Sequence, residues 1–427
     1  MESFRSELED LNNPVVARDI IDLEKKIRLF RDGKIDSEKF RGLRLARGIY
    51  GQRQEGVQMI RIKIPFGRIS TKQIRRIADI SDEYASSTLH ATTRQDIQIH
   101  YVSLDKTPEL WAKLEKDEIT TREACGNTVR NITASPTAGI DPNEPFDVSP
   151  YANEMFKYFL RNPICQEMGR KFKIAFSSSE EDTAYTFIHD LGFIPRIAFG
   201  KRGFRVVIGG GLGANPYLAQ LVYEFLEEDQ IIPFTEAVLR VFDRYGERNR
   251  RMKARLKFLL DDIGLEKLMA LIEEEKKALN THSYHINPSS LSEAVLPDAV
   301  EGSTEIADNL RYEHWFKSNV FAQKQAGFYG VNVKVPLGNL SSDKARQFAD
   351  VVDRYASNDV RVTINQGYLL RFVRPEALKG LYNALDSIAL AEPGFDSVAD
   401  ITACTGLTHV TSEFLTVHLS HLYLKKL

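Results

Sequence analysis

Cysteine is scarce in this chain. Cys125, Cys165 and Cys404 are its three cysteines, spread over 427 residues, and no two of them form a C-x-x-C pair. An odd and dispersed set argues against a disulfide framework and for reduced thiols. A cubane iron–sulfur cluster held only by cysteine needs four thiolates. This chain alone therefore cannot supply such a cluster.

Excess charge and long apolar runs are also missing. Lys and Arg number 57 against 59 Asp and Glu, so the formal charge is −2 and gives no global attraction to nucleic acid or anionic lipid. The N-terminus, MESFRSELED, is acidic, and no later stretch approaches the roughly 18 apolar residues of a membrane span. The sequence predicts a soluble, cytoplasmic protein of about two to four domains.

An internal repeat organises the chain. The segment that begins at Tyr50 has a gap-free counterpart that begins at Phe321, and a repeat of this length sets the architecture of a protein. Identical residues recur at one constant spacing: Gln52 and Gln323, Gln54 and Gln325, Gly56 and Gly327, Pro65 and Pro336, Gly67 and Gly338, Ala78 and Ala349, Tyr84 and Tyr355.

Each copy has the periodicity of a β-α-β unit. In the first copy, alternation predicts strands at residues 57–64 and 95–102, and helical spacing predicts a helix at residues 71–85 after a turn with Pro65 and Gly67. A unit of about 50 residues is too small to bury both faces of its sheet. We therefore expect the two copies to pair about a pseudo-twofold axis. The alternative is two independent copies of a common fold.

The segment between the copies has a different pattern. It predicts strands at residues 171–176 and 204–208, a helix at residues 180–191, and helical tracts at residues 216–226 and 232–277. A glycine-rich loop follows the second strand, and its backbone N–H groups are suited to a carboxylate or phosphate, although it does not match G-x-G-x-x-G. Its glycines are Gly209, Gly210, Gly211 and Gly213.

Basic side chains gather at the predicted strand entrances and turns. Lys171 and Lys173 project from one face of a predicted strand because side chains alternate with a period of two. Converging cations favour a small oxyanion and stabilise charge on its oxygens. A solvated surface is the alternative for each cluster alone. The clusters are Arg94, then Arg122 and Arg130 on either side of Cys125, then Arg170, Lys171 and Lys173. In the repeat, Asn365 stands at the position of Arg94.

Several ordered motifs resemble those of the sirohaem-containing sulfite and nitrite reductases: TTRQDIQIHYV, REACGNTVRN, GRKFKIAFSSS, VVIGGGLG and RYGERNRRMKARLKFLL. The resemblance implies an α+β fold in which two pseudo-symmetric ferredoxin-like β-α-β half-domains accompany an α/β sirohaem-binding domain, with the second, cluster domain missing. The implied ranges are an N-terminal helical segment at 1–45, half-domains at 46–105 and 315–385, the sirohaem domain at 106–285, a linker at 286–314, and the truncated start of the iron–sulfur domain at 386–427.

The resemblance also implies roles for single residues. The family's substrate-binding cations, which also supply or relay protons at the sirohaem iron, match Arg94, Arg130, Lys171 and Lys173. The implied cofactor-binding residues are Arg122, Asn127, Arg170, Gly209, Gly210, Gly211, Gly213 and Asn365. Lys173 favours the sulfite-reducing branch, because ferredoxin–nitrite reductases often place Asn there.

The implied activity is that of a ferredoxin-type assimilatory sulfite reductase, which carries out the six-electron reduction of sulfite to sulfide. Reduction of nitrite to ammonia and a non-catalytic sirohaem or oxyanion binder are the alternatives. The implied electron donor is a ferredoxin or a flavoprotein. A dense basic stretch on a predicted helix would steer an acidic donor, hold sirohaem carboxylates or form a solvated face: Arg248, Arg250, Arg251, Lys253, Arg255 and Lys257.

The resemblance ends near Cys404, which matches the family's first 4Fe-4S ligand. Val410 stands where the C-x5-C spacing requires the second cysteine. Codons for residues 406–415 can be chosen that, read from their third base, encode Thr-Asp-Thr-Cys-Asn-Leu-Gly-Ile-Ser and restore this spacing. We therefore expect a truncated chain on which no cluster assembles and which has little or no reductase activity. A one-nucleotide frameshift is our hypothesis for the cause, and resequencing the locus tests it.

Overall fold

The computed structural model describes residues 5–11, 13–298 and 305–403, which fall into two compact units. Residues 1–121 together with those from 294 onward form the first, which we call the repeat unit because it contains both copies. Residues 122–293 form the second, the central unit. The finer division into six ranges stays a prediction. Within the described ranges, no helix combines the length and the apolar character needed to cross a membrane.

Both copies in the repeat unit have the same order of elements. The first contains β1 (Ile49–Gly51), β2 (Val57–Ile62), β3 (Arg68–Ile69), α4 (Thr71–Tyr84), β4 (Thr88–Ala91) and β5 (Ile97–Ser103). The second contains β11 (Val320–Ala322), β12 (Tyr329–Val333), β13 (Asn339–Ser341), α11 (Ser342–Tyr355), β14 (Val360–Val362) and β15 (Tyr368–Val373). Helices α1 (Arg5–Glu9), α2 (Pro14–Arg31), α3 (Ser37–Leu45), α5 (Thr107–Glu115), α10 (Asn309–Asn319) and α12 (Leu378–Ser387) complete the unit. The predicted strands and helix are confirmed within a few residues, and the short β4 and β14 are additions.

Each copy contributes one short strand to the sheet of the other. The two sheets have the orders β1-β2-β5-β4-β13 and β11-β12-β15-β14-β3. Leu340 of β13 lies opposite Leu89 of β4, and Ile69 of β3 lies opposite Val360 of β14. The predicted pairing of the copies is therefore confirmed, and two independent folds are excluded.

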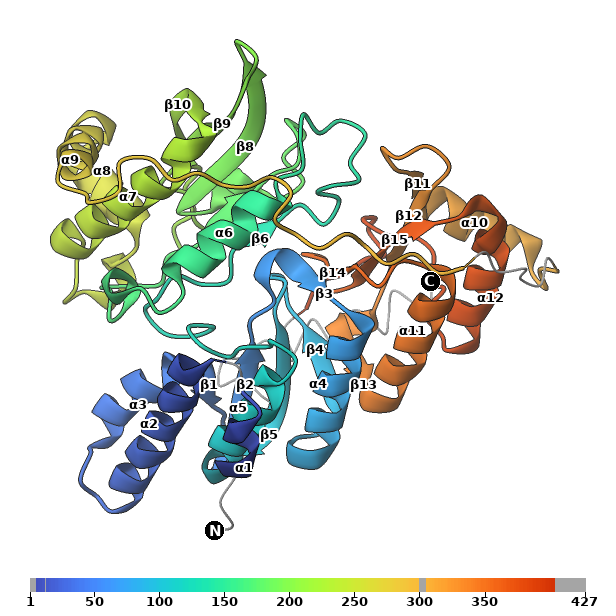
Figure 1. Cartoon of the computed structure of the whole chain (residues 1–427), viewed down its shortest axis with the longest axis horizontal. Coiled ribbons are helices and arrows are strands. Elements are labelled where there is room, and N and C mark those ends of the chain that lie inside the picture. Colours follow the sequence, from blue (N-terminus) through green and yellow to red (C-terminus); the bar gives the residue numbers. More distant parts are fainter. Residues whose placement is uncertain (1–4, 12, 299–304, 404–427) are drawn as a thin grey trace. The chain divides into compact units, whose positions relative to one another are not determined.

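The helices α4 and α11 lie side by side between the copies (Figure 1). Arg75 of α4 is 2.6 Å from an oxygen of Asp350 and 2.7 Å from one of Asp353. The equivalent Arg346 of α11 is paired with Asp79 at 2.8 Å and with Asp82 at 2.5 Å. The two sets of ion pairs occupy equivalent positions in the repeat, which is direct evidence of pseudo-twofold symmetry.

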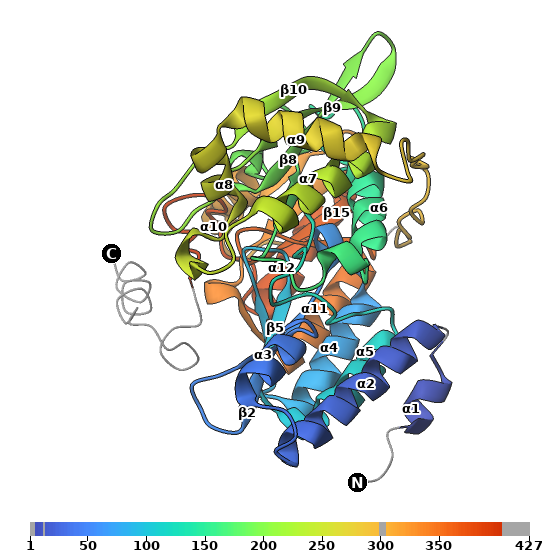
Figure 2. The ribbon, with the colours of Figure 1, turned by 90° about the vertical axis from the view of Figure 1, so that its left-hand side faces the viewer.

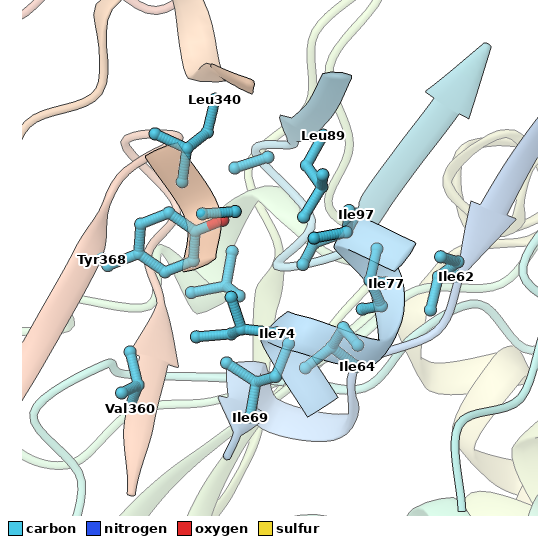
Figure 3. Packing of buried hydrophobic residues seen from close by; sticks show 14 of the residues in the cluster. Ile62, Ile64, Ile69, Ile74, Ile77, Leu89, Ile97, Leu340, Val360 and Tyr368 are labelled. Carbon is cyan, nitrogen blue, oxygen red and sulfur yellow. The ribbon is translucent and has the colours of Figure 1, made fainter. Parts of the chain in front are cut away.

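One apolar core serves both copies. Figure 3 shows residues of both copies in this core, among them Ile74 and Ile77 of α4 from the first copy and Leu340 and Tyr368 from the second. All four side chains are at most 1% exposed. Burying an aliphatic side chain of this size contributes about 1.5–3 kcal/mol. Neither copy can bury these residues alone, so the copies depend on each other for stability.

The central unit is a mixed five-stranded sheet with the order β10-β9-β8-β7-β6. β6 (Thr133–Ala134), β7 (Ile174–Phe176) and β8 (Leu191–Ala198) run parallel, whereas β9 (Lys201–Ile208) and β10 (Gln220–Glu227) are antiparallel to their neighbours. The helices are α6 (Ser149–Phe159), α7 (Ile231–Tyr245), α8 (Leu256–Ile263) and α9 (Leu265–Lys277). In Figure 2, α7 and α9 lie side by side.

Two helix predictions in the central unit are wrong. Residues 180–191 form turns and a single short 3-10 segment, Thr186–Ile188. There the Asp182 carboxylate accepts the Thr186 N–H at 2.9 Å, an alternative to helix that short polar side chains favour. Residues 216–226 fall largely in the strand β10, because pairing with β9 outweighs the local spacing of apolar residues.

Candidate functional site

Three of the four predicted substrate cations lie on one face of the central unit. Val129 forms a parallel bridge with Phe172, and the Arg130 N–H donates to the Phe172 carbonyl at 2.9 Å. Val129 and Phe172 are buried. Alternation along the two segments therefore places Arg130, Lys171 and Lys173 together on the opposite face, and all three are partly exposed. Their convergence on an anion stays a prediction.

The loop before Arg130 holds its guanidinium in place. Arg130 Nε donates to the Gly126 carbonyl at 3.1 Å, and Nη1 donates to the Ala124 carbonyl at 3.2 Å. Both carbonyls lie beside Cys125, which is a buried free thiol. A guanidinium anchored on two backbone carbonyls loses less side-chain entropy when it binds an anion.

Arg122, Asn127 and Arg170 surround this loop as partly exposed side chains. Arg122 Nη2 donates to Gln166 Oε1 at 2.8 Å. The Asn127 carbonyl accepts the Met168 N–H at 3.1 Å. These contacts fasten residues 122–128 to residues 166–170, so the three predicted cofactor-binding residues share one border of the site. Their contact with a cofactor stays a prediction.

Asp190 connects the cationic face to the glycine-rich loop. Its buried carboxylate accepts the Lys173 N–H at 2.8 Å and both ends of the Arg255 guanidinium, at 3.1 and 2.7 Å. Its carbonyl accepts the Gly209 N–H at 2.9 Å. Sequence reasoning missed Asp190, because its segment has the spacing of a helix and its partners are distant in the chain.

Different physical reasons account for the individual glycines of the loop. A Cβ at Gly209 would lie 2.3 Å from Leu260 Cδ2, and one at Gly210 would lie 2.4 Å from the Phe187 carbonyl. Packing thus accounts for both. Gly213 is exposed with φ of +118° and open space around it, so its backbone is accessible to a ligand. Gly211 is hydrogen-bonded to Tyr217 in both directions at 2.9 Å.

The basic stretch from Arg248 to Lys257 is not a helix, and that prediction is wrong. Its first part forms turns and a short 3-10 segment, Arg251–Lys253, and α8 begins only at Leu256. Internal partners engage most of its cations. Arg248 pairs with Asp243, Arg250 with Glu247 at 2.6 Å and Arg255 with Asp190. In the described part of the chain, the exposed side chains of Arg251 and Lys253 form no hydrogen bond or ion pair.

Two predicted site residues belong to the repeat unit. Arg94 lies in the turn between β4 and β5, where its N–H donates to Thr92 Oγ1 at 3.2 Å. Asn365 lies in the equivalent turn of the second copy, and its Nδ2 donates to Asp396 at 3.3 Å and to Asp400 at 3.5 Å. Carboxylates of its own unit thus engage the Asn365 amide. Its predicted role toward a cofactor stays untested.

Cys404, the predicted cluster ligand, lies outside the described residues. Among residues 5–11, 13–298 and 305–403, no three His, Cys, Asp or Glu side chains are grouped to hold a metal ion. The cationic face fits a different group. Its arginines and lysines suit the oxygens of carboxylates and oxyanions, so the donor set fits a cofactor or substrate that carries such groups.

The fold defines a protein with two paired β-α-β half-domains and a central unit that carries a cationic face. The description "Nitrite/Sulfite reductase ferredoxin-like half domain" matches residues 50–117 and 321–388, and "Nitrite and sulphite reductase 4Fe-4S domain" matches residues 125–279. The chain therefore belongs to the sirohaem-dependent sulfite and nitrite reductase family, whose cofactors are sirohaem and a 4Fe-4S cluster. The sequence-based assignment of family and fold class is confirmed.

Individual relatives agree with the family. A sulfite reductase [ferredoxin] of Mycolicibacterium paratuberculosis is 29% identical over 87% of this chain, and a chloroplastic ferredoxin–nitrite reductase of Zea mays is 28% identical over 81%. The chain spans 66% and 58% of their lengths, which is less than two thirds of either. The solved structure of the Mycobacterium tuberculosis NirA protein matches with a TM-score of 0.74 at 28% identity, over 88% of this chain and 68% of NirA.

Proposed function

We propose that this chain binds sirohaem and sulfite through the cationic face of the central unit, as a ferredoxin-type assimilatory sulfite reductase. The observation that carries the proposal is the shared face of Arg130, Lys171 and Lys173 beside the Asp190–Arg255 pair. The relatives' names include sulfite reductases. We assign Arg94 to the same function from the family motif.

The proposed cofactor would be held by the residues that border the face, Arg122, Asn127, Arg170 and the glycine-rich loop. Bound sirohaem supplies an iron that takes up electrons and binds the substrate's central atom. Lys171 and Lys173 would neutralise the charge of the sulfite oxygens and orient the anion. Because those oxygens leave as water, the reduction consumes protons, and an ammonium next to the oxygen is placed to deliver them.

Sulfite binding by the sirohaem-reconstituted chain tests this proposal. We expect Lys171→Met and Lys173→Met each to raise the Kd for sulfite about 10- to 100-fold, since a charge-assisted hydrogen bond is worth about 1.5–3 kcal/mol. The sirohaem absorbance should persist in both variants. Lys201→Met is the matched control, because Lys201 is exposed on β9 and pairs with Glu227. Equal sulfite affinity in all four proteins would refute the proposal.

Nitrite reduction is the alternative substrate class. Ferredoxin–nitrite reductases occur among the relatives. The family resemblance implies that lysine at position 173 favours sulfite, because ferredoxin–nitrite reductases often place Asn there. Because we expect little or no reductase activity from this chain, anion affinity separates the two substrates: the sirohaem-reconstituted chain should bind sulfite more tightly than nitrite, and Lys173→Asn should shift this ratio toward nitrite. Sirohaem binding without affinity for either anion would favour the non-catalytic binder, and steady production of sulfide or ammonia with an artificial reductant would refute the expected lack of activity. Iron and acid-labile sulfide in the same preparation test the prediction that no cluster assembles on this chain.

A ferredoxin is the donor we propose, in keeping with the names of the relatives. Arg251 and Lys253 are exposed cations of the basic stretch whose side chains form no hydrogen bond or ion pair with described residues, so they are available to an acidic surface. We expect the double variant Arg251→Glu, Lys253→Glu to slow the reduction of bound sirohaem by ferredoxin about tenfold at low salt. Reduction of the sirohaem by a small uncharged donor should keep its rate. Unchanged kinetics with ferredoxin would assign the stretch to a solvated face. We propose the cytoplasm as the compartment.

A further inference from the structure

The glycine-rich loop of the central unit is closed at its base. Gly211 and Tyr217 form two mutual hydrogen bonds of 2.9 Å, which join the ends of a short turn. Residues 212–216 lie between them and are all exposed; the Leu212 side chain, for example, is 58% exposed. Neither bond at the base orients the peptide groups at the tip of this loop.

Lys257 is the side chain that orients the peptide groups at the tip of the loop. It projects from the first turn of α8 and is only 3% exposed. Its Nζ is 3.4 Å from the carbonyl oxygens of Gly211 and Leu212, and it also donates to the Asn215 carbonyl. The rings of Tyr217 and Phe258 lie 5.2 and 5.0 Å from Nζ. Three carbonyls match the three protons of an ammonium, and the two rings add cation–π stabilisation.

The contacts of Lys257 with the loop carbonyls also determine the direction of two backbone N–H groups. In a trans peptide the C=O and the N–H point in opposite directions. Because the Gly211 and Leu212 carbonyls point toward Lys257, the N–H groups of Leu212 and Gly213 point away from it. Within the described ranges neither N–H has an acceptor. Successive outward N–H groups of this kind form an anion-binding concavity, and a cation on the carbonyl side strengthens them as donors.

We propose that residues 211–217 form a carboxylate-binding loop and that Lys257 is its positioning residue. Lys257 acts through the loop and not as a ligand, because its three protons already have acceptors and its side chain is buried. Resting on the proposed function, the ligand is a carboxylate of sirohaem, bound by the Leu212 and Gly213 N–H groups. Arg255, held by Asp190 with Nη2 beside Gly211, supplies the nearest positive charge.

Amide hydrogen exchange in the chain without cofactor tests the positioning role. We expect Lys257→Met to speed exchange of the Gly211 and Tyr217 amides at least tenfold, because the loop loses its internal cation. Lys267→Met is the matched control, since Lys267 is an exposed lysine of the neighbouring helix α9, and it should leave the exchange of both amides unchanged. Lys257→Gln keeps an N–H donor and should give an intermediate rate, and it decides the outcome if the Met variant does not fold. Wild-type exchange in the folded variants would overturn the proposal.

Retention of sirohaem tests the carboxylate. After reconstitution, the cofactor should dissociate about tenfold faster from Lys257→Met than from wild type or Lys267→Met, as followed by its absorbance during transfer to an acceptor protein. Faster amide exchange with unchanged retention would overturn the carboxylate site. That result would leave the proposed function standing, because the Lys171 and Lys173 variants probe the substrate face independently.

Discussion

Asp190 joins Lys173, Arg255 and Gly209 within the candidate site. Its carboxylate is fully buried and binds the Arg255 guanidinium at two points. Asp190→Asn would leave a largely buried guanidinium without a counter-charge, and breaking a buried pair in this way costs about 3–5 kcal/mol. Denaturant unfolding measures the loss.

The control for this substitution is Asp243→Asn. Asp243 pairs with Arg248, and both side chains are at least 40% exposed. Exposed pairs contribute about 0–1 kcal/mol, so this variant should unfold close to wild type. Similar losses in both variants would show that burial does not set the strength of the Asp190–Arg255 pair.

Sequence and structure agree on residues whose role is local and differ on residues whose role depends on distant partners. Alternation was enough to place Lys171 and Lys173 on one face, because the period of a strand is a local property. Asp190 and Lys257 act on segments far away in the chain, and neither spacing nor composition encodes such contacts. The helix predicted around the basic stretch failed for a different reason: the nearby carboxylates of Asp243 and Glu247 pair with Arg248 and Arg250 and hold this segment in a turn.

At the scale of elements, the repeat predicted that the copies pair but not how. The exchanged strands β3 and β13 span two or three residues each, too few for any alternation to be visible. Turns between the strands also join the copies, namely the β4–β5 turn with Gln95 and the β14–β15 turn with Gln366. Gln95 Nε2 donates to the Val362 carbonyl at 3.0 Å, and the equivalent Gln366 Nε2 donates to the Ala91 carbonyl at 3.1 Å. Each buried amide thus fastens one copy's turn to the other.

Gly67 is the residue that permits this close approach. It has φ of +73°, and a Cβ there would lie 2.5 Å from the Val362 carbonyl of the other copy. Gly67→Ala should therefore cost about 1–2 kcal/mol for the left-handed backbone and about 1–3 kcal/mol more for the clash. Thermal or denaturant unfolding of the variant measures the sum.

Gly56→Ala separates the two contributions. Gly56 has φ of +81°, but no atom lies within 4 Å of a Cβ placed there. This variant should show only the backbone strain and remain more stable than Gly67→Ala by at least about 1 kcal/mol. Equal unfolding free energies for Gly56→Ala and Gly67→Ala would mean that the copies can move apart at Gly67 without loss of stability. That result would contradict the proposed role of Gly67 in the close approach of the copies.

At the scale of the whole molecule, charge as well as apolar packing joins the two copies. Asp359 immediately precedes β14. Its Oδ1 lies 3.0 Å from Arg361 Nε, and its Oδ2 lies 2.9 Å from Arg371 Nη1. Arg68 of the first copy places its Nε 3.4 Å from the same Oδ2. Burial alone would raise the pKa of Asp359, but the three guanidinium groups outweigh burial and hold that pKa below its ordinary value. The ionised carboxylate is therefore a link between the copies.

Low pH should weaken the ion pairing of Asp359 between the copies, because protonation removes the charge of its carboxylate. A carboxyl group whose pKa is lower in the folded chain contributes stability that is complete above its unfolded pKa of about 3.9 and is lost as the pH falls through the folded value. Asp359→Asn removes the contribution at every pH, so its deficit in unfolding free energy should be large near pH 7 and shrink steadily below about pH 4. Glu376→Gln, at an exposed carboxylate of the same unit, should show no such convergence. A deficit for Asp359→Asn that stays constant down to the acid limit would mean that the three arginines gain nothing from the charge of Asp359.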